Sequence, residues 1–326
     1  MTPPSQPIRA DLRAVAADLL GGRKVDVLIG YEAGSQPLVA APLIIEAVDP
    51  DALHKVESLI FDARCEMNLA NYLHKHKGRR VALVVKGCDC RSVVGLLQEK
   101  QVEREKLVIL GAPCAGVVDV RLVARAVGGV AITSADLRDN ALTVHSGACP
   151  IHVSLDEVIY AGCRDCPARN PVLADFLVAD PVPQPDLPEI SPEVTAIRAL
   201  PSDRRYERFA SEMGKCILCY ACRNLCPACY CRRCFADDAK PRLVGRTDDP
   251  ADAMLFHLGR LLHLGGRCTG CGACVRGCPM NVDLRLYNDQ GRQHVRENYG
   301  FVAGLDPSAE PPLGCYGVND ENGFIL

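Results

Sequence analysis

The chain has 326 residues with a formal net charge of −3, and 48% of its residues are hydrophobic. This length predicts two or three domains, and the charge excludes a basic nucleic-acid-binding surface. The absence of Trp argues further against base stacking. No apolar run approaches the roughly 20 residues that span a bilayer, and the first residues lack a signal-peptide pattern. We therefore expect a cytoplasmic protein without a membrane span.

Residues 1–180 alternate between strand-like and helix-like segments. Apolar, β-rich runs at 24–30, 80–86 and 107–111 predict strands, and helical spacing at 51–60, 91–100 and 117–127 predicts helices. Such alternation is typical of an α/β domain with a mostly parallel sheet.

A proline-rich segment at 181–201 predicts an extended linker and a domain boundary near residue 190. Residues 202–290 form a cysteine-rich module, for which we predict helices at 202–213 and 251–263. Asp249 followed by Pro250 is a helix-start signal for the second of these. Residues 291–326 are expected to form a C-terminal tail.

The module contains the pattern C-x-x-C-x-x-C-x-x-x-C-P twice. This spacing is that of bacterial-type ferredoxins with two [4Fe–4S] clusters, in which the fourth cysteine of each run binds the other cluster. It predicts a ferredoxin-like α+β domain with crossed ligand sets. The first set is Cys216, Cys219, Cys222 and Cys278, and the second is Cys268, Cys271, Cys274 and Cys226. Structural zinc is the alternative, although zinc sites more often combine isolated C-x-x-C pairs with His.

Further cysteines lie in the α/β domain. Cys88 and Cys114 each follow a predicted strand, and neighbouring parallel strands end at the same edge of a sheet. With the C-x-x-C pair Cys163 and Cys166 they could form a third [4Fe–4S] site. The alternatives are buried thiols or zinc.

Three cysteines directly follow the first ferredoxin run and need a fourth ligand, for which Cys65 is a candidate. The predicted fourth site is therefore Cys65, Cys229, Cys231 and Cys234. Cys90, Cys149 and Cys315 fit no pattern and are read as ordinary thiols.

Two segments, Val84–Arg91 (VVKGCDCR) and Gly111–Gly116 (GAPCAG), resemble the beta subunits of coenzyme F420-dependent hydrogenases and formate dehydrogenases. The segment Lys215–Pro227 is similar to the ferredoxin insert of the same group. The resemblance implies an α/β domain that can bind FAD, with its edge near Lys86, Gly111 and Gly116, beside ferredoxin-type clusters. It also implies redox partner subunits: a catalytic hydrogenase, a formate dehydrogenase or a heterodisulfide-reductase-like module.

The sequence thus predicts an iron–sulfur electron-transfer subunit of a larger oxidoreductase, with no catalytic residues of its own. One alternative is an FAD-containing subunit that exchanges hydride with a deazaflavin or a similar carrier. Another is a zinc-stapled interaction scaffold.

Overall fold

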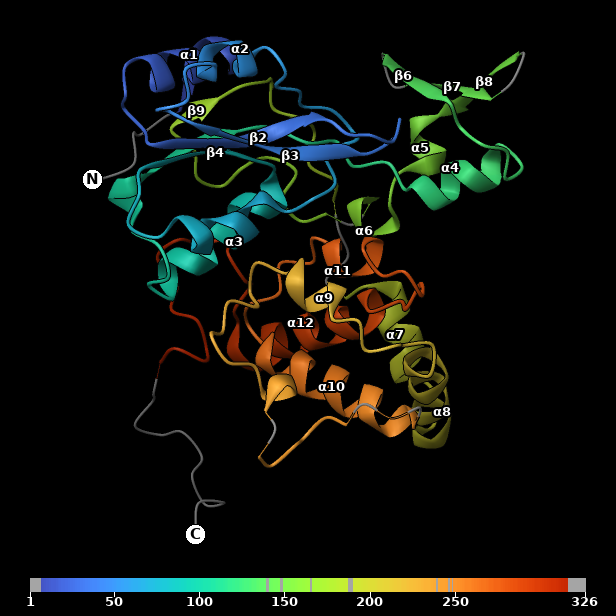
Figure 1. Cartoon of the computed structure of the whole chain (residues 1–326). Helices are drawn as coiled ribbons and strands as arrows, with labels where there is room; N and C mark the ends of the chain where they lie inside the picture. Colours follow the sequence, from blue (N-terminus) through green and yellow to red (C-terminus); the bar gives the residue numbers. More distant parts are fainter. Residues whose placement is uncertain are drawn as a thin grey trace.

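The computed structural model describes residues 7–138, 141–146, 149–164, 166–186, 190–238, 240–245, 247 and 249–315. In this part of the chain a six-stranded sheet lies above a helical assembly, and a small second sheet lies to one side (Figure 1). Among these residues no helix is both long and apolar enough to cross a bilayer.

The large sheet has the strand order β1-β9-β5-β4-β2-β3. Its strands are β1 (Ile8–Arg9), β9 (Phe176–Leu177), β5 (Leu107–Gly111), β4 (Val81–Val85), β2 (Val27–Ala33) and β3 (Ala40–Glu46). All neighbouring strands are parallel except β2 and β3. The predicted α/β architecture with a mostly parallel sheet is confirmed.

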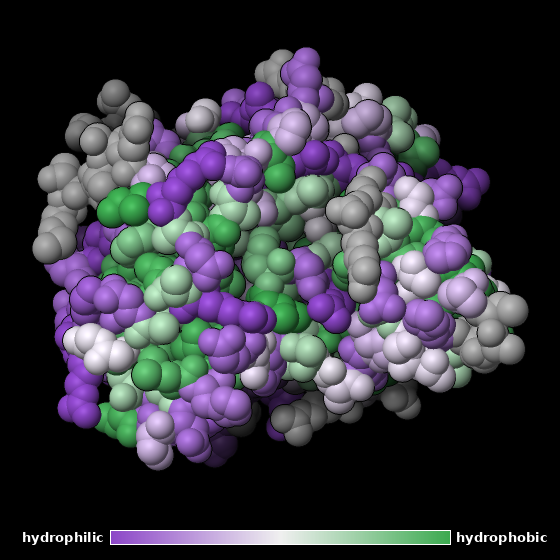
Figure 2. All heavy atoms as spheres, turned by 90° about the horizontal axis from the view of Figure 1, so that it is seen from above, coloured by the Kyte–Doolittle hydropathy of each residue, from purple (hydrophilic) through white to green (hydrophobic). Residues whose placement is uncertain are grey.

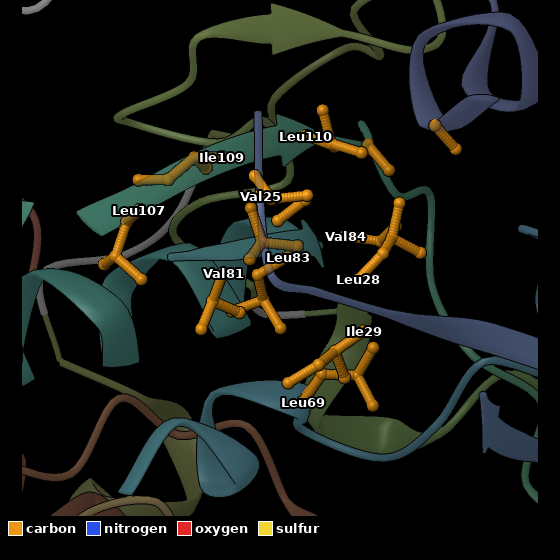
Figure 3. Close-up of a cluster of buried hydrophobic side chains, with 14 of the residues drawn as sticks. Val25, Leu28, Ile29, Leu69, Val81, Leu83, Val84, Leu107, Ile109 and Leu110 are labelled. Atoms are coloured by element: carbon orange, nitrogen blue, oxygen red, sulfur yellow. The ribbon is translucent and has the colours of Figure 1, made fainter. Parts of the chain in front are cut away.

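Helices cover both faces of this sheet (Figure 1). The helices α1 (Leu12–Gly21) and α2 (Ala52–Val56) lie on one face, and α3 (Gly87–Gln98) and the 3₁₀ helix η1 (Leu69–His76) on the other. Every residue of β4 is buried, as expected for a strand covered on both sides. The apolar side chains of β2, β4 and β5 form the core (Figure 3). A short 3₁₀ helix, η2 (Arg104–Lys106), leads into β5.

After β5 the chain forms a small unit in which the helix predicted at 117–127 is present and the sheet was not predicted. An antiparallel sheet of β6 (Ser134–Arg138), β7 (Ala141–Ser146) and β8 (Cys149–Ser154) packs against α4 (Val120–Ala126) and α5 (Leu155–Val158). Its core includes Val123, Leu142, Val144 and Val153. The helix α6 (Ala161–Arg164) then returns the chain towards the helical assembly (Figure 1).

The helical assembly contains α7 (Pro192–Arg198), α8 (Ser202–Met213), α9 (Ala221–Asn224), η3 (Phe235–Asp237), α10 (Pro250–His263), α11 (Ala273–Arg276) and α12 (Arg285–Tyr299). The predicted helices at 202–213 and 251–263 are confirmed, and the Asp249 side chain accepts a hydrogen bond from the Ala251 amide at 2.8 Å. The described residues beyond 190 contain no strand, which differs from the expected α+β module. The helix α7 also lies inside the segment expected to be an extended linker.

Buried hydrogen bonds join the helical assembly to the α/β unit. The Arg91 guanidinium on α3 is almost completely buried and donates to the carbonyl oxygens of Ala303 (2.7 and 2.9 Å) and Thr269 (2.9 Å). The Asn71 amide donates to the Asn224 carbonyl at 2.8 Å. The cysteine-rich loops are therefore held against α3 and η1, the helices that cover this face of the sheet. On the opposite side, seen from above, hydrophilic and hydrophobic residues are interspersed (Figure 2).

Candidate metal centre

The two ferredoxin-type runs have the same local backbone. In each, a loop with two residues in the left-handed region leads into a one-turn helix, α9 or α11. These residues are Leu218 and Tyr220 in the first run and Gly270 and Gly272 in the second, with φ between 51° and 73°. Leu218 and Tyr220 adopt this conformation at a cost of roughly 1–2 kcal/mol each. Strain of this kind is typical of ligand-binding loops.

The left-handed residues turn backbone amides towards sulfur. The Leu218 amide donates to Cys216 Sγ at 3.3 Å, and the Gly270 amide hydrogen-bonds the equivalent Cys268. The two runs also pack against each other, because a Cβ on Gly277 would lie 2.1 Å from the Leu225 side chain. Close packing of this kind brings the fourth cysteine of each run towards the other run.

The second predicted ligand set lines one cavity. Its members are Cys226, Cys268, Cys271 and Cys274, so a cysteine of the first run lies among three of the second. The Asn288 amide donates to Cys274 Sγ at 3.6 Å. Burial raises the pKa of Cys268 to about 12 and that of Cys274 to about 11. Thiols of this kind ionise when a metal binds them.

The first predicted set also gathers in one place. Cys216 lies within electrostatic range of Cys219 and Cys278, and Cys222 lies within range of Cys216 and Cys278. The Cys278 sulfur accepts a hydrogen bond from the Val282 amide at 3.4 Å. All four cysteines of this set therefore converge on one region beside α9.

A histidine that no sequence pattern had singled out also lies at this site. His257 is buried on α10, and its Nε2 lies 3.3 Å from Cys216 Sγ. Burial and, to a lesser extent, the nearby Arg260 lower the pKa of His257 to about 4, so the imidazole is neutral. A neutral imidazole with a proton on Nε2 donates a hydrogen bond to the sulfur. In the sequence, His257 and Arg260 share a helix face with apolar residues, and polar side chains on such a face indicate a site inside the protein.

The four cysteines of the predicted third set line a separate small cavity. Cys88 lies in the first turn of α3, Cys114 follows β5, and Cys163 and Cys166 lie in and after α6. The strands β4 and β5 run parallel in register, which brings the chain after each of them to the same edge. α3 begins earlier than predicted, so Cys88 is helical instead of lying in a loop.

Glycines permit the close approaches around this third cavity. A Cβ on Gly87 would lie 1.8 Å from the Ala168 carbonyl oxygen, so α3 begins in direct contact with the segment after Cys166. Gly116, at φ +146°, has the Ile159 side chain 2.9 Å from its Cβ position. Larger residues at either position would separate the chain segments that carry the cysteines.

One cysteine lies between two cavities. Cys271 of the second ferredoxin run lines both the cavity of its own set and the cavity of Cys88 and Cys114. The buried Arg276 also lines the second of these cavities and donates to the Cys271 carbonyl at 3.0 Å. The two cysteine-lined cavities therefore adjoin.

The residues predicted to form a flavin edge do not fit FAD. Lys86 is 2% exposed and is bound to Asp89 and to the Met67 carbonyl. A Cβ on Gly111 would lie 2.8 Å from Ala174, and Gly116 is covered by Ile159 as described above. Lys86, Gly111 and Gly116 are therefore closely packed, with Lys86 and Gly116 in the wall of the cysteine-lined cavity, and the structure gives no support to a flavin edge at these residues.

The predicted fourth set does not assemble. Cys229, Cys231 and Cys234 line a cavity of about 190 Å³ beside α10. Cys65 instead lies fully buried in the core of the large sheet, where its nearest charged groups and thiols include Lys86 and Cys114. The grouping of Cys65 with the other three is wrong, because Cys65 packs in the core of the large sheet and does not line their cavity.

The remaining cysteines have no ligand set. Cys90 is buried and donates to the Leu173 carbonyl at 3.1 Å, and Cys315 is exposed near the end of the described chain. The side chain of Cys149 lies outside the described residues. Across the described residues, no three His, Cys, Asp or Glu side chains are close enough together to hold a single metal ion.

Comparison with known proteins identifies part of this chain. Residues 78–197 match the family described as the C terminus of the coenzyme F420 hydrogenase/dehydrogenase beta subunit. This part of the chain is similar to that beta-subunit family. The family resemblance read from the sequence is thereby confirmed. The matched residues include Cys88, Cys114, Cys163 and Cys166, whereas both ferredoxin runs lie outside them.

Two curated relatives are formate dehydrogenase subunits. The F420-dependent formate dehydrogenase subunit beta of Methanocaldococcus jannaschii is 32% identical over 107 residues, which is 33% of this chain. The F420-dependent formate dehydrogenase 1 subunit beta of Methanococcus maripaludis is 28% identical over 110 residues, also 33% of this chain. The chain spans about a quarter of the length of each relative, 27% in both cases.

A solved structure is also similar. It is a chain from the F420-reducing [NiFe] hydrogenase complex of Methanosarcina barkeri, with a TM-score of 0.37 and 14% identity. The match covers 47% of this chain and 57% of that chain.

Proposed function

We propose that this chain is an iron–sulfur electron-relay subunit of a larger oxidoreductase. The observation that carries the proposal is the position of Cys271, which lines two adjoining cavities that are each surrounded by cysteines. Clusters in adjoining cavities would supply one-electron carriers at short separation. The chain's own residues would hold these clusters and set their environment.

The proposed relay has three centres. Its ligand sets are Cys216, Cys219, Cys222 and Cys278; Cys226, Cys268, Cys271 and Cys274; and Cys88, Cys114, Cys163 and Cys166. The buried cations Arg260 and Arg276 lie beside these thiols. Positive charge near a cluster offsets the negative charge of its thiolates and stabilises the reduced state.

The donor arrangement favours clusters over zinc. Thiolates of a mononuclear zinc site surround one ion at about 2.3 Å and therefore lie close together. A cubane is several times larger than one ion, so its ligands stand further apart. Sets of four cysteines around one cavity can hold this larger group.

The names of the curated relatives indicate which partner subunits to propose. Both curated relatives are named as beta subunits of F420-dependent formate dehydrogenases. We propose that this chain passes electrons to or from a catalytic subunit of formate dehydrogenase, hydrogenase or heterodisulfide-reductase type. The FAD-containing alternative loses its support at the predicted edge, because Lys86 and the two glycines are packed inside the protein.

The first test is anaerobic quantitation of iron, sulfide and flavin per chain. Three cubanes correspond to about twelve irons and about twelve sulfides. The variant Cys114→Ser should lose about four irons, whereas the matched variant Cys90→Ser, which alters a buried thiol outside the ligand sets, should keep the wild-type content. Folded wild-type protein without iron or sulfide would overturn the proposal.

The second test addresses the crossed ligand sets. Cys222→Ala and Cys278→Ala should alter the same paramagnetic signal of the reduced protein, although 56 positions separate them (278 − 222). Cys222→Ala and Cys226→Ala should alter different signals. Identical spectra for the last two variants would contradict the crossed assignment.

A further inference from the structure

A cavity beside α10 combines three thiols and a histidine. Directly after the first ferredoxin run the chain reads C-x-C-x-x-C, and Cys229, Cys231 and Cys234 all line this cavity of about 190 Å³. The cavity adjoins the proposed site of Cys226, whose thiol is hydrogen-bonded to that of Cys229, but none of its three thiols belongs to the three proposed ligand sets. These thiols therefore require their own explanation.

His263 is the fourth candidate donor. It is the last residue of α10, lines the same cavity, and packs its ring edge-on against Phe235 with centroids 5.2 Å apart. The other side chain of a ligand type in the wall is Asp237. Both of its carboxylate oxygens already accept hydrogen bonds from Arg223, at 2.8 and 2.9 Å.

We propose that Cys229, Cys231, Cys234 and His263 hold a fourth iron–sulfur cluster. The inference rests on the proposed relay function and extends it. His263 takes the place that the sequence analysis had given to Cys65. Imidazole is an established alternative to thiolate in iron–sulfur sites, where it raises the reduction potential.

The charge around the cavity suits a cluster with three thiolates. Arg223, Arg260 and Arg267 all contribute to the wall. Arg260 is almost fully buried and also hydrogen-bonds the Cys222 carbonyl at 3.1 Å. Arg223 and Arg267 are already paired with Asp237 and Glu99, so Arg260 supplies the positive charge that offsets an anionic group here, which would otherwise be costly to bury.

The spacing of the donors argues against a single ion. Among the described residues, which include all four of these side chains, no three candidate donors come within reach of one ion. Four donors distributed around a cavity of this volume suit a larger inorganic group. A Cys₃His zinc site, by contrast, brings its four donors together at about 2.0–2.3 Å from one ion.

The site lies next to the proposed relay and reaches solvent. Its wall shares Ala228, Arg260, Leu264 and Arg267 with the cavity of Cys226, Cys268, Cys271 and Cys274. Cys231 is exposed at the outer side. A cluster here therefore forms the solvent-facing end of the relay, where electrons pass to or from a partner.

Metal analysis of single variants tests the inference. We expect about sixteen irons per wild-type chain if each of four sites holds a cubane. Cys231→Ser and Cys234→Ser should each lose about four irons and leave the signals of the other centres unchanged. His263→Ala should lose the same iron, whereas the matched control His294→Ala, a histidine on α12, should lose none.

A rescue variant separates ligation from packing. His263→Cys should retain the iron but shift the midpoint potential of this centre downwards, because an anionic thiolate replaces a neutral imidazole. About twelve irons in the wild type, unchanged in Cys231→Ser, would overturn this inference and leave the three-centre relay intact. One zinc per chain that is lost in Cys231→Ser would overturn it as well. A wild-type protein without iron would instead remove the relay itself.

Discussion

The buried ion pair between Lys86 and Asp89, at the end of β4, allows a quantitative test of how much the Lys-Gly-Cys-Asp segment stabilises the protein. Lys86 Nζ donates to Asp89 Oδ2 at 2.8 Å, to the Met67 carbonyl at 2.6 Å and to the Tyr31 hydroxyl. Lys86 is 2% exposed and Asp89 is fully buried. All three ammonium protons are therefore used inside the protein. The pair holds the first turn of α3, which carries Cys88, against the sheet.

The variant Lys86→Met removes the cation and leaves the Asp89 carboxylate buried without its main partner. Breaking a buried ion pair from one side costs about 3–5 kcal/mol. With about 2–4 °C per kcal/mol for a unit of 150–250 residues, the midpoint of thermal unfolding should fall by roughly 6–20 °C. The double variant Lys86→Met/Asp89→Leu should recover most of this loss, because an apolar pair of similar volume replaces buried ion pairs at little cost.

Thermal unfolding of the anaerobic holoprotein, followed by circular dichroism, measures both effects. The matched control is Lys24→Met, whose partner Asp18 lies at 2.7 Å but whose pair is more than half exposed. An exposed pair contributes only about 0–1 kcal/mol, so this control should shift the midpoint little. A midpoint for Lys86→Met that stays at the wild-type value would refute the reasoning. So would a double variant that loses as much as the single variant.

Three further predictions concern the sites. Gly87→Ala places a Cβ 1.8 Å from a backbone oxygen, so it should destabilise the protein by roughly 3 kcal/mol or more and lower its iron content. The control Gly95→Ala lies on the same helix with open space around it, and it should change neither stability nor iron content. Burial raises the pKa of Cys90 to about 11, so this thiol stays protonated at about pH 8 and should resist iodoacetamide in the native protein. The exposed Cys315 should react, and equal labelling of the two cysteines by mass spectrometry would contradict the prediction. Arg276→Met removes a buried cation beside Cys271, so potentiometric titration should show the midpoint potential of one centre lowered by tens of millivolts. Arg276→Lys keeps the charge and should largely avoid this shift, and an unchanged potential in Arg276→Met would count against the assignment.

The positions of Cys88 and Cys114 could be predicted because they follow from a general rule. Parallel neighbouring strands end at one edge, so any two residues just after β4 and β5 lie near each other. The crossed sets are predicted from spacing alone, because the ferredoxin loop repeats with fixed intervals, and they stay a prediction. Both inferences needed only local pattern and topology.

The proposed fourth ligand beside Cys229, Cys231 and Cys234 could not be predicted in this way. No interval in the sequence relates these cysteines to His263, which reaches the cavity only because α10 packs beside the loop. Cys65 failed as a candidate for the same reason, since its burial under the sheet depends on tertiary packing. The small sheet was a different case. Leu142 and Val144 alternate with polar residues along β7, and this period-two pattern is sufficient to predict the strand.

The third cysteine-lined cavity joins the part of the chain that matches the beta-subunit family to the second ferredoxin-type run. Cys88, Cys114, Cys163 and Cys166 all lie in the part that matches the beta-subunit family, yet their cavity is completed by Cys271 from outside that match. Arg91 and Arg276 reinforce this junction, because each hydrogen-bonds backbone carbonyl oxygens on the far side of it. Neither part alone encloses the third site. Loss of the second ferredoxin run should therefore remove metal from a site whose four proposed ligands all remain in the chain.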